Sequence, residues 1–140
     1  MMDTISIIGL TDTGTQAARQ LLATQPECDL TVYDRDPVRG EVFRGQATLA
    51  GSPAEALRES HLIVLALSDS HEIDRVLQRY SDGDVNAPLH GKHILDLCPH
   101  AEDWGRRLAH AIRAASGIYR ASTARELPDL IAGAVASRST

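Results

Sequence analysis

The chain has 140 residues, of which 43% are hydrophobic and only 4% aromatic, and its formal net charge is −5. This length fits a single domain with an aliphatic core, covering residues 1–140 with a frayed tail from about residue 137. The acidic balance argues against a nucleic-acid partner, and no apolar run approaches the roughly 20 residues of a membrane span.

The N-terminal residues Met-Met-Asp-Thr lack the basic start and the apolar stretch of a secretory signal peptide. The two cysteines, Cys28 and Cys98, lack metal-ligand spacing, and we interpret them as free thiols of a reducing compartment. We therefore expect a cytoplasmic protein.

The first half of the chain alternates short apolar runs with helical patterns. The continuous β-branched run TISII predicts a strand over Thr4–Ile8 that is covered on both faces, and helical spacing follows over 13–24. A second strand is predicted over 30–34 and a weaker third over 47–50. The capping box SPAE, with proline at the first helical position, predicts a helix over 53–59 that is capped by Ser52.

The second half begins with HLIVLAL, which predicts the strongest strand of the chain, over 61–67. A helix follows, with candidates for its N-cap at 68–70 and apolar residues at helical spacing. After a polar loop, the sequence predicts a strand over 92–97, a helix from Pro99 to about Gly117, a strand over 118–121 and a last helix over 126–136.

This alternation predicts an α/β fold: a Rossmann-like, doubly wound, mostly parallel sheet of about six strands with helices on both faces. Ligands of such sheets bind outside the carboxyl ends of the strands. The segments that follow the strands are therefore the candidates for function, and they are 9–14, 34–36, 68–70 and 98–100.

The segment GLTDTG resembles the G-x-G-x-x-G phosphate turn of dinucleotide-binding domains, with Thr11 in place of the middle glycine. Gly9 permits the tight turn out of the strand, and Gly14 allows the helix to approach that strand. Backbone N–H groups and the helix dipole would face a pyrophosphate. Thr11 either narrows this approach or offers its hydroxyl to a phosphate oxygen. Thr13 and Thr15 are further hydroxyl donors.

Two acidic residues modify this interpretation. Asp12 brings negative charge close to the expected anion, which is unfavourable. Asp34 lies 20 residues beyond Gly14, about the separation at which a carboxylate accepts hydrogen bonds from the adenosine ribose. Such a carboxylate repels a 2′-phosphate, so we expect NAD rather than NADP, although Arg35 could hold that phosphate. The structural alternative for Asp34 is a turn residue in YDRDP.

The motifs GLTDTGTQAARQLL, LTVYDRDP, GSPAEAL and HLIVLALSDS together resemble the NAD(P)-binding domain of the β-hydroxyacid dehydrogenases. This family includes the 6-phosphogluconate and 3-hydroxyisobutyrate dehydrogenases, with imine reductases as relatives. The resemblance covers roughly residues 4–121. It implies an oxidoreductase with NAD or NADP as cofactor, bound by Gly9, Leu10, Thr11, Asp12, Thr13, Gly14, Asp34, Arg35, Leu67, Ser68, Asp69 and Cys98.

The sequence departs from this family in the residues that bind the substrate and catalyse its conversion. The family's D-A-P-V-S-G substrate segment corresponds here to Arg120–Arg125, which keeps only Ala121. The family's catalytic lysine lies in a second, all-α domain beyond the end of this sequence. Lys92, the only lysine, belongs to the GK that precedes the fifth strand in the family. We therefore identify no catalytic residue in this chain.

Two functions stay open at this point. One is an oxidoreductase component completed by a homodimer partner, a helical subunit or a second domain, with residues 118–135 as the interface. The other is a non-catalytic nucleotide sensor or degenerate scaffold module, which Thr11 and Asp12 favour. The sequence also leaves open that the chain is a fragment of a longer protein, and it names no substrate.

The remaining candidates are weak. His90, His93 and His100 lack zinc-type spacing with a third ligand, so no metal site is predicted. His71 is interpreted as a solvated residue at a helix start. Cys98 would face the nicotinamide side of the cleft or be a small buried apolar residue. Ser68 and Asp69 have no histidine in a triad order, which argues against nucleophilic hydrolysis.

Overall fold

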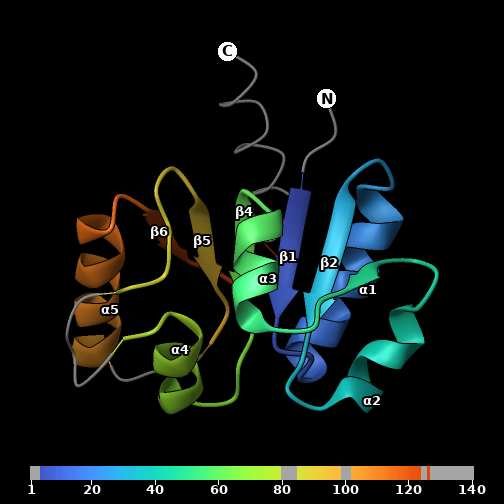
Figure 1. Cartoon of the computed structure of the whole chain (residues 1–140), viewed down its shortest axis with the longest axis horizontal. Coiled ribbons are helices and arrows are strands. Elements are labelled where there is room, and N and C mark those ends of the chain that lie inside the picture. The colour runs from blue at the N-terminus through green and yellow to red at the C-terminus, as the bar shows by residue number, and fades with distance from the viewer. Residues whose placement is uncertain (1–3, 80–84, 99–101, 124–125, 127–140) are drawn as a thin grey trace.

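The computed structural model describes residues 4–79, 85–98, 102–123 and 126, and its framework is one six-stranded sheet (Figure 1). All paired strands run parallel, in the order β3-β2-β1-β4-β5-β6. This is the doubly wound order of Rossmann folds, and it confirms the predicted fold class. The strands are β1 (Thr4–Ile8), β2 (Asp29–Tyr33), β3 (Thr48–Leu49), β4 (Leu62–Leu65), β5 (His93–Asp96) and β6 (Ile118–Ala121).

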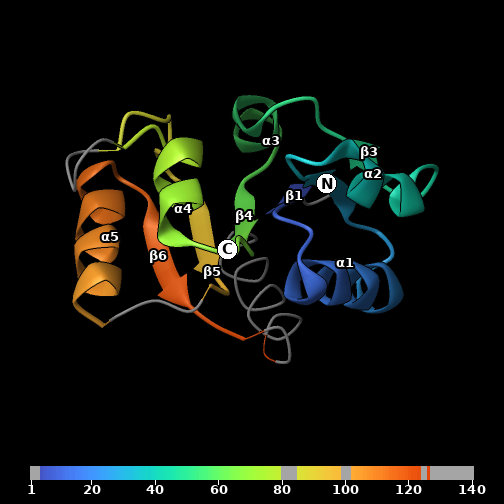
Figure 2. The same cartoon turned by 90° about the horizontal axis from the view of Figure 1, so that it is seen from below.

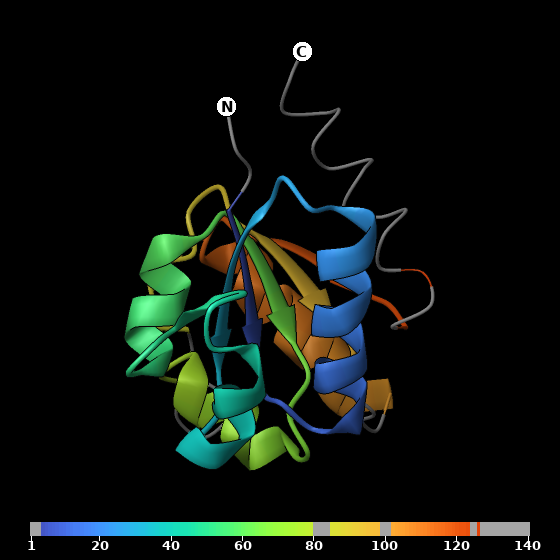
Figure 3. The same cartoon turned by 90° about the vertical axis from the view of Figure 1, so that its right-hand side faces the viewer.

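Helices cover both faces of the sheet. Figures 2 and 3 show α1 on one face and α3 and α4 on the other. Figure 1 shows α5 beside β6, and the apolar residues of α5 pack with those beneath α3 and α4. The helices are α1 (Asp12–Thr24), α2 (Pro37–Gly40), α3 (Pro53–Glu59), α4 (Ser70–Val76) and α5 (Glu102–Ala114), with a 3-10 turn at Glu41–Phe43.

The core is aliphatic, as the composition predicts, and the sheet divides it into two clusters. Beneath α1, strand residues such as Ile7 and Val32 pack against Ala17 and Leu21. On the other face, Ile63 and the residues around it pack against α3, α4 and α5. Because alternate residues enter opposite clusters, the inner strands are largely apolar on both faces, with Ser6 and Thr31 as buried polar exceptions.

The observed elements differ from the predicted ones mainly at their ends. Helix α1 begins at Asp12, one residue early, and the strand predicted over 61–67 is only Leu62–Leu65. Helix α2 was not predicted, because it has four residues and no apolar periodicity; the side chain of Asp36 caps it and Pro37 opens it. The predicted helix start at Pro99 and the helix residues 127–136 lie outside the described residues.

The order of the strands creates one opening for a ligand. From β1 the chain moves outward to β2 and β3, and it then returns past β1 to β4, β5 and β6. The connections after β1 and β4 therefore diverge at the carboxyl ends of these adjacent strands. This divergence is the topological switch point, where doubly wound sheets bind ligands.

Candidate functional site: the carboxyl edge of the sheet

The turn between β1 and α1 requires glycine at both of its ends. Gly9 has a φ of +103°, and a Cβ on it would lie 2.5 Å from the carbonyl oxygen of Ala66. A Cβ on Gly14 would overlap the carbonyl oxygen of Gly9. These two glycines therefore make the tight turn and the close helix packing that the sequence predicts.

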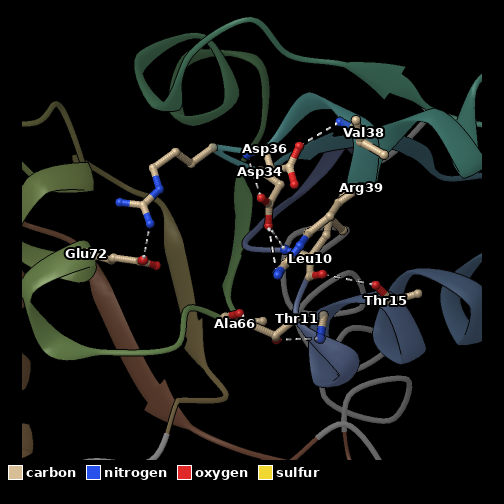
Figure 4. Close-up of polar contacts among 11 residues, drawn as sticks. Leu10, Thr11, Thr15, Asp34, Asp36, Val38, Arg39, Ala66 and Glu72 are labelled. Carbon is tan, nitrogen blue, oxygen red and sulfur yellow. Dashed lines mark hydrogen bonds and ion pairs between the residues drawn. The ribbon is translucent and has the colours of Figure 1, made fainter.

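Thr11, which replaces the middle glycine, directs its hydroxyl into the protein. Its Oγ1 donates a hydrogen bond to the carbonyl oxygen of Ala66 at 2.9 Å and accepts one from the N–H of Gly14 at 3.3 Å (Figure 4). Thr11 is therefore the N-cap of α1 and also ties the turn to the end of β4. The hydroxyl is engaged by these two groups rather than presented to a phosphate oxygen.

The first turn of α1 contains the N–H groups that suit an anion. The N–H of Gly14 donates to the Thr11 side chain, and the N–H of Thr15 donates to the Thr11 carbonyl oxygen at 2.8 Å. The N–H groups of Asp12 and Thr13 come before these bonds, where an α-helix offers no acceptor of its own. The helix dipole favours an anion there, whereas the exposed carboxylate of Asp12 opposes one.

The carboxylate of Asp34 is fixed beside this turn by two backbone groups. The N–H of Leu10 donates to Oδ2 at 2.7 Å, and the N–H of Asp36 donates to Oδ1 at 2.8 Å (Figure 4). The guanidinium of Arg39 lies 3.9 Å from Oδ2. Asp34 is thus a turn residue, and the same bonds position its carboxylate at the phosphate turn. Carboxylate oxygens accept more than one hydrogen bond, so this structural role leaves room for ribose hydroxyls.

A cavity of about 280 Å³ opens between the carboxyl ends of β1, β2 and β4 and helix α4. Small-molecule sites commonly measure about 300–1,000 Å³, so this volume suits one half of a dinucleotide. The residues that line it are Gly9, Thr11, Tyr33, Asp34, Arg35, Asp36, Arg39, Pro53, Leu67, Ser68, Glu72, Arg75 and Val76.

Two oppositely charged side chains, from different walls of this cavity, form an ion pair. The Nη2 atom of Arg35, at the end of β2, lies 3.6 Å from Oε1 of Glu72 in the first turn of α4 (Figure 4). Helix α4 is capped by Asp69, whose Oδ1 accepts from the N–H of Glu72 at 3.0 Å. The loop after β4 and the start of α4 therefore form one wall, and the end of β2 forms the opposite wall.

The carboxyl ends of β5 and β6 carry a second hydrogen-bonded cluster. Asp96, only 2% exposed, accepts from the N–H of Cys98 at 2.9 Å and from the hydroxyl of Tyr119 at 2.7 Å. The sulfur of Cys98 accepts from the N–H of Leu67 at 3.1 Å, and its thiol donates to the carbonyl oxygen of Leu65 at 3.4 Å. This cluster joins the end of β5 to the ends of β4 and β6.

Burial, followed by the negative charge of Asp96, raises the pKa of the Cys98 thiol. Burial and the hydrogen bond to Asp96 likewise raise the pKa of Tyr119. Both side chains are therefore protonated at neutral pH, and Cys98 is not a thiolate nucleophile. Of the two interpretations from the sequence, the structure favours a structural thiol, since backbone groups of the neighbouring strand hold it.

The predicted cofactor-binding residues gather at this edge. Six of the twelve line the cavity: Gly9, Thr11, Asp34, Arg35, Leu67 and Ser68. The other six are not among the lining residues: Asp12, Thr13 and Gly14 form the first turn of α1, Leu10 contributes its N–H while its side chain is buried, Asp69 caps α4, and Cys98 joins β4 to β5.

Seven lining residues are absent from the predicted cofactor-binding set, although Asp36 lies in the candidate segment 34–36; they are Tyr33, Asp36, Arg39, Pro53, Glu72, Arg75 and Val76. Two of them carried a usable signal. Asp36 precedes a proline, as an N-cap does, and Glu72 lies three residues after Asp69, the spacing of a capping box. Nothing in the sequence indicates that Glu72 faces the end of β2, because that proximity depends on the tertiary packing of α4.

The other singled-out residues lie away from the cavity lining. Lys92 precedes β5, and its Nζ donates to the carbonyl oxygens of Leu57 and Ser60 at the end of α3, at the opposite edge of the sheet. His71 is exposed on α4, and Cys28 and Cys98 do not form a disulfide with each other. Within the described ranges, no group of three or more acidic, cysteine or histidine side chains could hold a metal ion.

The strand order, the glycine turn and the fixed carboxylate of Asp34 define a dinucleotide-binding domain of Rossmann type. Residues 4–118 match the family of the NAD binding domain of 6-phosphogluconate dehydrogenase, and the chain belongs to that family. This finding agrees with the resemblance drawn from the motifs. No curated protein sequence gives a significant match.

Imine reductases and a reductive aminase are among the solved structures that are similar to this chain. A reductive aminase from Aspergillus terreus in complex with NADPH and ethyl levulinate is 26% identical, with a TM-score of 0.72, over 90% of this chain and 44% of that chain. An imine reductase from Pseudomonas sp. is 25% identical, with the same TM-score and coverage. A variant of the imine reductase from Myxococcus stipitatus in complex with NAD+ has a TM-score of 0.76 at 22% identity, over 90% of this chain and 43% of that one, which shows the fold alone.

The chain thus spans less than half the length of these structures. In the part of the chain that the structure describes, every helix is too short or too polar to cross a membrane.

Proposed function

We propose that this protein binds NAD(H) at the carboxyl edge of its sheet and supplies the cofactor half of a cytoplasmic oxidoreductase. The observation that carries the proposal is the carboxylate of Asp34, which lines the cavity and accepts a hydrogen bond from the N–H of Leu10. In this arrangement the adenosine ribose would hydrogen-bond Asp34, and the pyrophosphate would lie on the N–H groups of Asp12 and Thr13. A similar protein solved with NADPH supports a nicotinamide dinucleotide as the ligand.

NAD is proposed over NADP because the cavity offers no excess of positive charge. Three carboxylates and three guanidinium groups line it, so their formal charges cancel; they are Asp34, Asp36 and Glu72 against Arg35, Arg39 and Arg75. A 2′-phosphate would add close to two negative charges beside Asp34. A ribose with free hydroxyls adds none.

Reduction of a carbonyl or imine also requires a proton donor and a substrate pocket. Tyr119 is a described residue on the nicotinamide side that carries a hydroxyl group. This hydroxyl already donates to Asp96 and its pKa is raised, which makes it a poor proton donor. We therefore propose that a second domain, a helical subunit or a second copy of the chain completes the site.

The predicted interface over residues 118–135 begins on the edge strand β6, where Ile118 is 51% exposed. An exposed apolar side chain on an edge strand favours coverage by another element. Light scattering at micromolar concentration should show a dimer or, with a separate subunit present, a complex. A strictly monomeric species under both conditions contradicts this part of the proposal.

Calorimetric titration with NADH and NADPH tests the binding itself. We expect saturable binding of NADH with one site per chain, and weaker binding of NADPH. If neither cofactor binds, the oxidoreductase function is wrong.

A non-catalytic nucleotide sensor is the second candidate, and Thr11 favours it. By capping α1 with its own hydroxyl, Thr11 occupies the N–H of Gly14 that a phosphate oxygen could use. The two functions differ in turnover: an oxidoreductase component oxidises NADH when the helical half and a carbonyl or imine compound are supplied. A sensor binds NADH and leaves it unchanged under the same conditions.

A further inference from the structure

Helices α3 and α4 both have glutamate as their third residue, but the two side chains find different partners. In α3, Glu55 reaches back to the N–H of Gly51, just before its own helix. This is close to the behaviour of a capping-box glutamate. In α4, Glu72 instead lies 3.6 Å from the guanidinium of Arg35, on another element. The local sequence of both helices favours a glutamate that reaches back to an N–H before its own helix. We therefore attribute the different partner of Glu72 to the position of Arg35.

The Arg35–Glu72 pair lies in the lining of the cavity. Both residues line the cavity, Arg35 from the end of β2 and Glu72 from α4. The side chain of Glu72 is only 21% exposed, whereas that of Arg35 is 72% exposed. Figure 4 shows Glu72 and Asp34 on different elements; both line the cavity, and Asp34 is the residue proposed to bind the adenosine ribose. Arg35 follows Asp34 in the chain, so it lies where a 2′-phosphate on that ribose would be placed.

Pairing with Glu72 determines what Arg35 offers to a ligand. An arginine beside the ribose binds a 2′-phosphate through its positive charge and its planar N–H groups. A carboxylate 3.6 Å from that guanidinium offsets its positive charge. Replacing Glu72 by a neutral residue changes the balanced lining to a net charge of +1, since three guanidinium groups would then face two carboxylates.

We infer that Glu72 is a specificity-determining residue, which holds Arg35 in an ion pair and thereby makes the cavity select a ribose with free hydroxyls over a 2′-phosphorylated ribose. This inference rests on the proposed function, the binding of a dinucleotide at this edge. Glu72 acts through Arg35 and is a positioning residue rather than a contact to the reacting atoms.

The test measures two half-ligands, AMP and adenosine 2′,5′-bisphosphate, and the two cofactors NADH and NADPH by calorimetry. Glu72→Gln should tighten the bisphosphate and NADPH about tenfold, the effect of one unit charge near a protein surface. Its affinity for AMP and NADH should change much less, so the ratio of bisphosphate to AMP affinity should rise. Glu55→Gln is the matched control, because it neutralises the equivalent residue of α3 without touching Arg35, and it should leave all four affinities unchanged.

Two double variants separate the ion pair from a general charge effect, because Glu72→Gln combined with either Arg35→Gln or Arg75→Gln returns the lining to a net charge of zero. The inference expects the gain in 2′-phosphate binding to disappear with Arg35→Gln and to persist with Arg75→Gln. An equal loss of the gain in both, or a ratio of bisphosphate to AMP affinity that Glu72→Gln does not alter, overturns the inference and leaves NADH binding standing. Failure of the wild-type chain to bind any of the four ligands overturns both the inference and the proposed function.

Discussion

The hydroxyl of Thr11 donates a hydrogen bond to the carbonyl oxygen of Ala66, 2.9 Å away at the end of the neighbouring strand β4. The same hydroxyl accepts from the N–H of Gly14. Thr11, which interrupts the glycine pattern, therefore forms two side-chain hydrogen bonds at the switch point of the sheet. It stabilises the turn, and it does so with groups that lie next to the proposed position of the pyrophosphate.

Thr11→Gly should tighten NADH binding about three- to tenfold, because the N–H of Gly14 is released and the β-branched side chain is removed; this corresponds to one net hydrogen bond. The same variant should lower the free energy of unfolding by about 1 kcal/mol through loss of the bond to Ala66 and of the cap. Calorimetry and urea unfolding measure the two effects.

Two variants control this experiment. Thr11→Ser keeps the hydroxyl and should resemble the wild type in both measurements. Thr24→Gly alters the last residue of α1, far from the turn, and should lower stability without tightening NADH. Unchanged affinity in Thr11→Gly would show that the cofactor does not lie on this turn.

Gly14→Ala should destabilise the fold by about 3 kcal/mol, because its methyl group overlaps the carbonyl oxygen of Gly9, a backbone atom that cannot easily move. Gly51→Ala is the matched control: its Cβ would lie 3.6 Å from the Glu55 carboxylate, an ordinary contact. Urea unfolding compares the two. Equal stability of the two variants would contradict the close approach of α1 to β1.

Asp34→Asn should weaken NADH binding at least about tenfold, because a carboxylate that accepts from the ribose hydroxyls is replaced by an amide with one acceptor. The asparagine has one amide oxygen in place of two carboxylate oxygens, so it can accept from the N–H of Leu10 or from that of Asp36, but not from both. The free energy of unfolding should therefore fall by about 1 kcal/mol. NADPH should lose less affinity than NADH, because the charge that repels its 2′-phosphate is gone. Equal losses for both cofactors would remove Asp34 from the ribose site.

The raised pKa values of Cys98 and Tyr119 predict how stability depends on alkaline pH. Each group holds its proton more tightly in the folded chain than in the unfolded chain, so the unfolded state releases protons first. The contribution is complete below their ordinary pKa values of 9.0 and 10.0 and is lost as the pH rises above them.

Tyr119→Phe removes one of these groups and should flatten the alkaline fall in the free energy of unfolding. Urea unfolding at several pH values from neutral upward gives the two slopes. A Tyr119→Phe slope as steep as that of the wild type would contradict the buried hydrogen bond to Asp96.

Much of the fold could be predicted from the sequence, because continuous β-branched runs such as Thr4–Ile8 and caps such as Ser52 are local signals. The glycine turn and Asp34 were predictable for the same reason. The hydrogen bond from Thr11 to Ala66 and the pairing of Arg35 with Glu72 were not, since they join segments that only the tertiary fold brings together. The end of β4 was misplaced because the apolar run continues through Ala66 and Leu67, beyond the last strand residue Leu65.

The most direct test of the central claim is a map of the backbone amides that respond to NADH, measured by heteronuclear NMR on the 140-residue chain. The dinucleotide site predicts saturable shifts at 9–14, at 34–36 and at 67–72, with His61 and His93 at the opposite edge of the sheet unaffected. Shifts confined to that opposite edge, or no saturable shifts at all, would contradict a cofactor at the carboxyl ends of β1, β2 and β4.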